Sequence, residues 1–233
     1  MSMKPADARA RMVDRQLALR GIADRRVLDA FRDVPRDAFV PAELAEFAYD
    51  DTPLPIGEGQ TISQPYIVAV TIEALGLEGG ERVLEIGTGS GYAAAVLGRL
   101  ANEVFTVERL ESLADHARKR LKDLGFHKVY VLHGDGTLGW PEHAPYDAIA
   151  VAAGGPEVPE ALAEQLAPGG RLVIPVGSDE TSQVLTRFTR KKSGKLREEP
   201  LSPVRFVPLI GEQGWPDRQR GLPVPATRDR SLP

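Results

Sequence analysis

The stretch Val83–Tyr92 reads VLEIGTGSGY, an apolar run followed by three glycines within five positions. A short buried strand that ends in glycines and opens a helix is typical of open α/β sheets, where ligands bind beyond the carboxyl ends of the strands. Bare backbone lets such a ligand approach closely. The pattern alone is also compatible with a tight turn that binds no ligand. Other features of the sequence are needed to distinguish these two alternatives.

The composition limits the class of protein. The chain has 233 residues, of which 42% are hydrophobic, enough for one α/β domain with additions. A net charge of −4 argues against nucleic-acid binding as the main function of the protein. The absence of cysteine excludes disulfides, thiolate metal sites and cysteine nucleophiles. The four histidines show no metal-ligand spacing, so we expect no metal site.

The N-terminus and the hydropathy pattern indicate where the protein works. Residues 1–16 are charged from the start, which is unlike a signal peptide. No apolar run approaches the roughly 20 residues of a membrane span. We therefore expect a soluble, cytoplasmic protein without membrane contact.

From residue 81 onward, strand and helix patterns alternate, which predicts a doubly wound, mostly parallel Rossmann-like α/β sheet. We expect strands at 82–86, 103–107, 128–132, 146–152 and 171–176, and helices at 92–100, 110–124 and 157–166. Beyond Gly177, the segments Val184–Arg190 and Val204–Ile210 predict a closing antiparallel pair.

The flanking regions have a different character. Residues 5–40 show helical periodicity, with Asp24 as the N-cap of a second helix and Pro35 at its end. Residues 50–64 read as a loop, and a helix follows from Pro65. We expect one domain over 1–211, made of N-terminal helices and a substrate loop (1–79), a cofactor-binding core (80–177) and C-terminal strands (178–211), followed by a disordered tail at 212–233.

The glycine loop does not fit a dinucleotide. The fingerprint G-x-G-x-x-G requires a third glycine where Tyr92 stands. Glu85, two residues before Gly87, is a poor neighbour for a pyrophosphate and suits a cationic ligand. A nicotinamide-dependent oxidoreductase is therefore disfavoured.

Two further acidic residues follow neighbouring strands. Glu108 stands about 20 residues after the loop begins, where a carboxylate accepts hydrogen bonds from ribose hydroxyls. Asp135, before Gly136, could accept a hydrogen bond from an adenine amino group, although turn chemistry explains it equally well. Together they describe a pocket for an adenosine nucleoside with a cationic, amino-acid-like end and no phosphate, a description that S-adenosylmethionine fits.

This set resembles the class I S-adenosylmethionine-dependent methyltransferases over about residues 80–177, with motif I at the glycine loop. The resemblance places Glu108 at the ribose and Asp135 at the adenine, and implies S-adenosylhomocysteine as product. The candidate cofactor-binding residues are Gln64, Glu85, Gly87, Gly89, Gly91, Glu108, Asp135 and Gly136.

The absence of two sequence motifs indicates which chemical group accepts the methyl group. A carboxylate is ionised at neutral pH and needs no base, unlike an amine or a hydroxyl. No base motif is evident, and the end of the fourth strand lacks the Asn/Asp-Pro-Pro-aromatic tetrad of amino-methylating enzymes. Both observations favour carboxyl methylation.

The segment DDTPLPIGEGQTISQPYIVA (50–69) resembles the signature of the protein-L-isoaspartate (D-aspartate) O-methyltransferases. The same family is resembled by three further segments: VPRDAFVP, HGDGTLGWPEHAPYD and PVRFVPLIG. The likeness therefore spans about residues 10–211. It implies repair: the enzyme methylates the abnormal carboxylate of L-isoaspartyl residues in damaged proteins, and the ester closes to a succinimide that partly reopens to aspartate.

The same resemblance assigns roles near the loop. It makes Ser63 the active-site serine, placing the substrate carboxylate by a hydrogen bond; the alternative is that Ser63 only caps the following helix. Gln64 would line the cofactor, and Pro53–Gln60 with Val204–Val207 would flank an extended peptide. We expect a monomer whose partners are isoaspartyl proteins and peptides, not nucleic acid.

Some points depart from the family or stay open. Gly154-Gly155-Pro156 replaces Ala-Ala-Pro, which predicts a looser turn, and the tail after Gly211 has no counterpart. A methyltransferase that acts on RNA or on a small molecule would keep motif I, and so would a binding module without activity.

Overall fold

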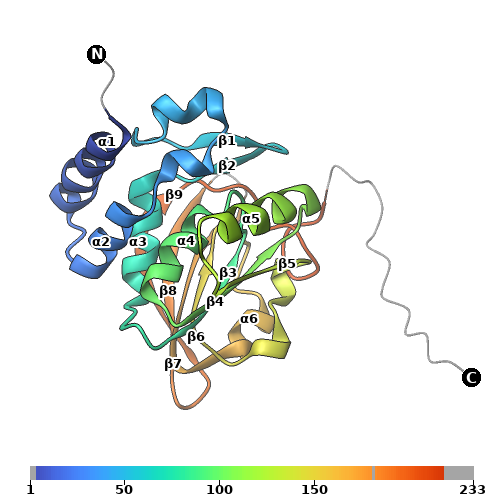
Figure 1. Ribbon diagram of the computed structural model, residues 1–233. Helices are drawn as coiled ribbons and strands as arrows, with labels where there is room; N and C mark the ends of the chain where they lie inside the picture. Colours follow the sequence, from blue (N-terminus) through green and yellow to red (C-terminus); the bar gives the residue numbers. More distant parts are fainter. Residues whose placement is uncertain (1–3, 180–181, 218–233) are drawn as a thin grey trace, which may run out of the picture.

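The computed structural model describes residues 4–179 and 182–217. Its centre is a seven-stranded sheet with the order β5-β4-β3-β6-β7-β8-β9 (Figure 1). The strands are β3 (Arg82–Ile86), β4 (Glu103–Glu108), β5 (Val129–His133), β6 (Tyr146–Val151), β7 (Leu166–Val176), β8 (Gln183–Arg190) and β9 (Leu196–Val204). β3 to β7 pair in parallel, whereas β8 and β9 are antiparallel. The expected doubly wound sheet with a closing antiparallel pair is confirmed.

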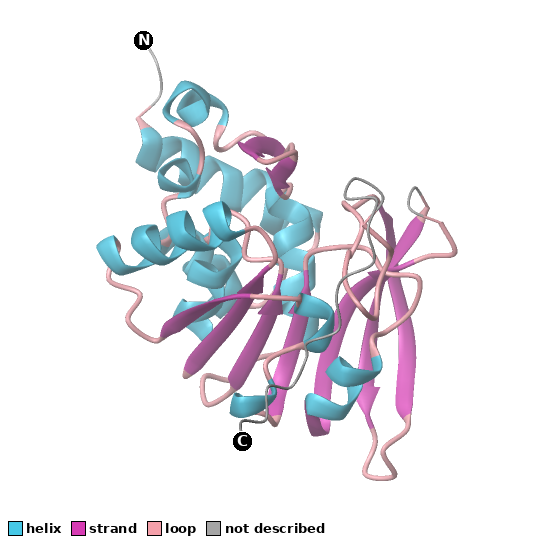
Figure 2. Cartoon of the chain, turned by 90° about the vertical axis from the view of Figure 1, so that its right-hand side faces the viewer, coloured by secondary structure: helices cyan, strands magenta, loops and turns pink. Residues whose placement is uncertain are grey.

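Two hydrophobic cores lie on opposite faces of this sheet. Val83 and Val104 belong to the core under α3 (Pro65–Leu75), α4 (Tyr92–Leu100) and α5 (Glu111–Asp123). Their neighbours Leu84 and Phe105 point to the other core, which α6 (Glu160–Gln165) helps to cover. The alternation follows from the two-residue repeat of a strand. Figure 2 shows most of the helices gathered on one face of the sheet.

The N-terminal helices pack outside that helical layer. They are α1 (Pro5–Met12), a π-helical turn (Val13–Leu17), a 3-10 turn (Ala18–Arg20) and α2 (Arg25–Asp33), with 3-10 turns at Arg36–Phe39 and Ala42–Phe47. The predicted N-cap is confirmed, because the Asp24 side chain accepts a hydrogen bond from the Arg26 N–H at 2.8 Å. α2 contacts α4, so the N-terminal layer supports the helix that follows the glycine loop.

The segment expected to be a loop contains a β-hairpin, so that expectation was wrong. β1 (Leu54–Gly57) and β2 (Gln60–Ile62) pair antiparallel as a sheet of their own. The turn passes through Gly57, Glu58 and Gly59, whose φ angles of 94°, 52° and 68° lie in the left-handed region. Glycines on both sides of Glu58 make this turn possible and were the sequence signal for it.

The second closing strand was misplaced. β9 spans Leu196–Val204, not the expected 204–210. The turn that contains Gly194, at φ 83°, joins β8 directly to β9 and fixes their register. Residues 205–210 instead cross the sheet edge, where Gly154 donates to the Val207 carbonyl at 2.8 Å and accepts from Leu209 N–H at 2.8 Å. The turn at Gly154 is therefore closely packed rather than loose.

The chain stays ordered beyond the boundary expected at residue 212. The Glu212 N–H donates to Asp135 at 2.7 Å, and the Trp215 indole N–H donates to the Gly154 carbonyl at 3.0 Å. The rest of the predicted tail, 218–233, lies outside the described residues. Over the ranges that the structure describes, no helix combines the length and the apolar character needed to cross a bilayer.

Candidate active site

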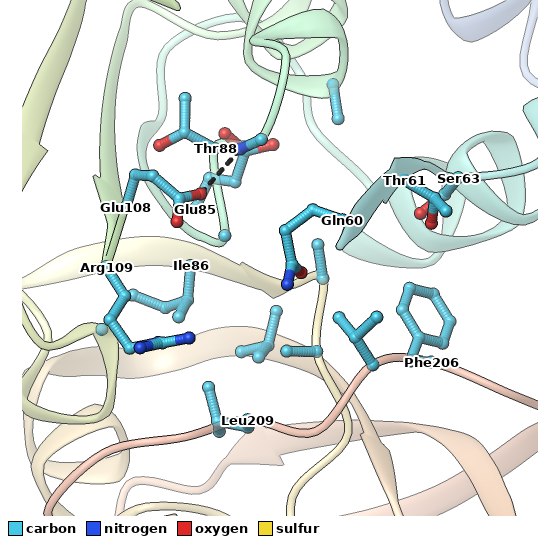
Figure 3. A pocket seen from close by; sticks show the side chains of 18 of the residues that line it. Gln60, Thr61, Ser63, Glu85, Ile86, Thr88, Glu108, Arg109, Phe206 and Leu209 are labelled. Atoms are coloured by element: carbon cyan, nitrogen blue, oxygen red, sulfur yellow. Dashed lines mark hydrogen bonds between the residues drawn. The ribbon is translucent and has the colours of Figure 1, made fainter. Parts of the chain in front are cut away.

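A cavity of about 570 Å³ opens at the carboxyl ends of β3, β4 and β6. Its walls come from the glycine loop, from the hairpin and the middle of α3, and from the segments 206–210 and 215–217. Figure 3 shows Glu85 and Glu108 on one side and Thr61 and Ser63 across from them, with Gln60 pointing between the two sides. The cavity therefore lies at the carboxyl ends of the parallel strands, the edge of the sheet where the sequence predicts a ligand site.

The glycine loop forms the floor beside β3. Gly87, Gly89 and Gly91 have φ angles of 90°, 53° and 90°, a conformation that favours glycine. Gly87 and Gly89 line the cavity. Gly91 does not; it is the N-cap of α4, and a Cβ there would approach Leu121 Cδ1 at 3.3 Å. Gly87 and Gly89 thus leave the cavity wall without side chains, whereas Gly91 allows close packing of the helix.

Glu85 is the most buried charged group of the site, with 1% of its surface exposed. Its neighbour across the strands is Thr106, whose hydroxyl donates to Glu85 Oε2 at 2.6 Å. Thr106 also lies 2.6 Å from the Thr88 hydroxyl in the glycine loop. Burial raises the pKa of Glu85 to about 8, and the nearby charge of Glu108 acts in the same direction. A cation in the cavity would favour the ionised carboxylate.

Glu108 ends β4 and is turned towards the glycine loop. Its Oε2 accepts from the Gly89 N–H at 2.8 Å, and its Oε1 accepts from the Leu110 N–H at 3.0 Å. A carboxylate has about four acceptor positions, so two remain for hydroxyl groups of a ligand. The two backbone bonds hold the carboxylate in place and leave those positions free.

Asp135 and Gly136 differ in position. Gly136 lines the cavity, and a Cβ there would lie 2.4 Å from Ile86 Cγ2. Asp135 is not among the lining residues. Its Oδ1 accepts from the Thr137 N–H and hydroxyl, and its Oδ2 accepts from the Glu212 N–H. The predicted adenine acceptor is thus engaged with its own turn and with the segment after Gly211.

Ser63 and Gln64 stand side by side with different surroundings. Ser63 lines the cavity, and its hydroxyl makes no hydrogen bond within the described residues. The N-cap of α3 is Gln64, without a side-chain cap bond, so the structure gives Ser63 no capping role. Gln64 is absent from the lining; its amide donates to the Asp51 carbonyl and carboxylate at 3.1 and 2.8 Å.

Several lining residues were not singled out from the sequence. Thr61 comes from the hairpin, Arg109 follows Glu108, and Trp215 and Asp217 belong to the segment predicted to be a tail. An isolated tryptophan in a segment rich in Pro and Arg was the one signal that the tail has an anchor. In the described part of the chain, no three His, Asp or Glu side chains are grouped as metal ligands would be.

These features fit a nucleoside cofactor. The cavity has the volume for a ligand of that size, and Gly87, Gly89 and Gly136 leave parts of its wall without side chains. A fixed carboxylate at the end of β4 faces the loop, and a second, buried carboxyl lies beneath it. These acceptors suit hydroxyl groups and a positive charge better than they suit phosphate.

Comparisons with known proteins identify a family that uses such a cofactor. The family model for protein-L-isoaspartate(D-aspartate) O-methyltransferase matches residues 8–214. Protein-L-isoaspartate O-methyltransferase 1 of Rhodopseudomonas palustris is 60% identical over 210 residues, 90% of this chain and 86% of the relative. Protein-L-isoaspartate O-methyltransferase 2 of Marinobacter nauticus is 59% identical over 211 residues, 91% of this chain and 96% of the relative.

Solved structures give the same result. A protein-L-isoaspartate O-methyltransferase superposes with a TM-score of 0.80 at 33% identity, over 88% of this chain and 67% of that one. A beta-aspartate methyltransferase from Plasmodium falciparum, in complex with S-adenosyl-L-homocysteine, superposes with a TM-score of 0.75 at 29% identity, over 87% of this chain and 98% of that one.

Proposed function

The chain belongs to the protein-L-isoaspartate(D-aspartate) O-methyltransferase family, and from this premise we propose how its cavity carries out the reaction. The enzyme transfers a methyl group from S-adenosylmethionine to the abnormal carboxylate of L-isoaspartyl residues in damaged proteins. The observation that supports our assignment of roles best is that Ser63 and Glu108 line the same cavity from opposite sides.

The cofactor is assigned to the glycine side of the cavity. Glu108 would accept hydrogen bonds from the ribose hydroxyls with the acceptor positions that Gly89 and Leu110 leave free. Gly87 and Gly89 would lie against the amino-acid end, whose positive charge Glu85 favours from below. Gly136 would contact the adenine. When bound, the cofactor supplies an electrophilic methyl group on a sulfonium.

Asp135 has two possible roles. One is the predicted acceptor for the adenine amino group. The other is an anchor for the segment after Gly211, supported by the hydrogen bond from the Glu212 N–H at 2.7 Å.

Ser63 is assigned to the substrate. Its hydroxyl would donate a hydrogen bond to the isoaspartyl carboxylate and turn one oxygen lone pair towards the methyl group. This is catalysis by orientation, because an ionised carboxylate has no proton to lose. Figure 3 shows Glu85 and Glu108 across the cavity from Ser63, which agrees with this role.

The peptide is assigned to the mouth of the cavity. β2 forms one wall, and the crossing segment with Phe206 and Pro208 forms the other. An extended chain between them would expose its backbone to both walls, which suits an enzyme that accepts many sequences around one damaged residue. We further propose that one cytoplasmic monomer suffices and that nucleic acid takes no part, since a single chain supplies every wall of the cavity.

The test is methyl transfer from labelled S-adenosylmethionine to paired peptides that differ only in an aspartyl or isoaspartyl linkage. We expect label on the isoaspartyl peptide alone, in a base-labile ester. If the cofactor binds but neither peptide is labelled, the substrate assignment fails, and RNA and small metabolites become the candidates. Equal labelling of both peptides would contradict recognition of the damaged linkage.

A further inference from the structure

The charged groups around the cavity are unequal in number. Among the described residues, three carboxylates (Glu58, Glu108 and Asp217) and the carboxyl group of Glu85, whose pKa is raised, line it against a single guanidinium, that of Arg109. Figure 3 shows the Arg109 side chain extending from the Glu108 side into the cavity, next to Ile86. A cation therefore lies within the site that is assigned to a cationic ligand.

Asp217 is the carboxylate that faces this guanidinium. Its Oδ2 lies 3.3 Å from Arg109 Nη1, and the two side chains are 15% and 32% exposed. Partial burial screens such a pair less than an ion pair in open solvent. Asp217 thus offsets the charge of Arg109 inside the cavity wall.

The segment that carries Asp217 is fixed to the core. Besides the bonds of Glu212 and Trp215, the Gln213 N–H donates to the Thr137 hydroxyl at 3.1 Å, and its side chain accepts from the Ala161 N–H at 3.0 Å. Glycine is needed for this docking, since a Cβ at Gly211 would lie 2.1 Å from Asp135 Oδ1. Asp217 is therefore presented to Arg109 by an ordered part of the chain.

We propose that Asp217 is a selectivity residue of the cofactor site, which favours S-adenosylmethionine over S-adenosylhomocysteine by offsetting the positive charge of Arg109. The substrate cofactor carries a sulfonium, an ammonium and a carboxylate, a net charge of +1. The product has lost the sulfonium charge and is neutral overall. Loss of the Asp217 charge leaves the wall more positive by one unit, which disfavours the first ligand more than the second. The inference rests on the proposed function, because it takes this cofactor pair as the ligands.

The charges of Asp217 and Arg109 should change the relative affinity for the two ligands only a few-fold, and in opposite directions. A unit charge roughly 10 Å from the sulfonium, at an effective dielectric constant of about 40 to 80, changes a binding constant by about two- to fourfold. Asp217→Asn should weaken binding of S-adenosylmethionine by about that factor relative to S-adenosylhomocysteine. Arg109→Met should shift the ratio the opposite way, and the double variant should return it towards the wild-type value.

The experiment is calorimetric titration of the full chain with each ligand, at low salt and at about 0.5 M salt. The ratio of the two dissociation constants should change in the variants at low salt. This change should be smaller at high salt, because mobile ions screen the interaction. Asp217→Glu keeps the charge and should keep the ratio. Asp123→Asn removes the same charge from an exposed pair with Lys119 on α5 and is the matched control. Thermal unfolding of each variant shows whether it is folded.

The possible results distinguish failure of the proposed function from failure of the selectivity role of Asp217. If wild-type protein binds neither ligand, the proposed function fails. If both ligands bind and Asp217→Asn weakens them equally, or Arg109→Met shifts the ratio in the same direction as Asp217→Asn, Asp217 only supports the wall and the selectivity role is overturned. A ratio that moves as much in Asp123→Asn would also overturn it.

Discussion

Replacing Glu85 by glutamine tests the physical reading of the buried carboxyl. Burial raises its pKa from 4.5 to about 8, so the folded protein holds a proton over a pH range in which the unfolded chain has lost it. The free energy of unfolding therefore falls by about 1.4 kcal/mol per pH unit as the pH rises through that window. The whole loss from this group is at most roughly 5 kcal/mol, because water entering the cavity would reduce it.

Glutamine resembles the protonated acid in shape and still accepts the hydrogen bond from Thr106. Near pH 5 we expect the Glu85→Gln variant to be about as stable as the wild type without cofactor. Near pH 9 it should be the more stable of the two by several kcal/mol. Urea unfolding followed by tryptophan fluorescence at a series of pH values measures the difference, in which groups common to both proteins cancel. Glu164→Gln, at an exposed position of α6, is the matched control.

The cofactor adds a second readout. If the cationic ligand favours the ionised carboxylate, its affinity should rise with pH up to about 8 in the wild type and lose this dependence in Glu85→Gln. A stability difference between the two proteins that does not change with pH would refute the raised pKa. A cofactor affinity with the same pH dependence in both would refute the link between Glu85 and the bound cation.

Three further substitutions address the remaining assignments. Ser63→Ala should lower methyl transfer about 10- to 100-fold with cofactor affinity unchanged in calorimetry; weaker cofactor binding would contradict a substrate-side role. Glu108→Gln should weaken cofactor binding about tenfold or more, since charge-assisted bonds to the ribose become neutral ones, and an unchanged dissociation constant would remove Glu108 from the ribose site. Asp135→Asn should weaken S-adenosylhomocysteine and its analogue without the adenine amino group equally, because that carboxylate is engaged by Thr137 and Glu212; a loss confined to the amino-bearing ligand would make Asp135 the adenine acceptor.

The parallel core was predictable because its signals are local. The strand Arg82–Ile86 and the helix Tyr92–Leu100 have the bounds that apolar runs and glycines indicated. The position of Glu108 follows from the same repeat, since a residue at the end of the next parallel strand must reach the same edge of the sheet.

The misplaced parts depend on contacts that are distant in sequence. The strand expected at Val204–Ile210 has a suitable composition, but the turn around Gly194 places an earlier segment against β8. Asp217 could not be assigned to the site from its surroundings in the sequence, because its segment is held by hydrogen bonds to Gly154, Asp135 and Ala161 that span 52 or more residues. Neither Arg109 nor Asp217 belongs to a pattern that indicates an ion pair.

The separate hairpin has a consequence for the order in which the molecule opens. β1 and β2 form a two-stranded sheet that shares no ladder with the seven-stranded one, and its tip is tied down by the hydrogen bond from Ser112 to Glu58 at 2.9 Å. An isolated two-stranded ribbon is marginally stable in water. Its amide protons should exchange with deuterated solvent well before those of β3 and β4, while the parallel core stays folded. The hairpin, to which we assign one wall of the peptide site, can thus open and re-form without unfolding of the parallel core, to which we assign the cofactor.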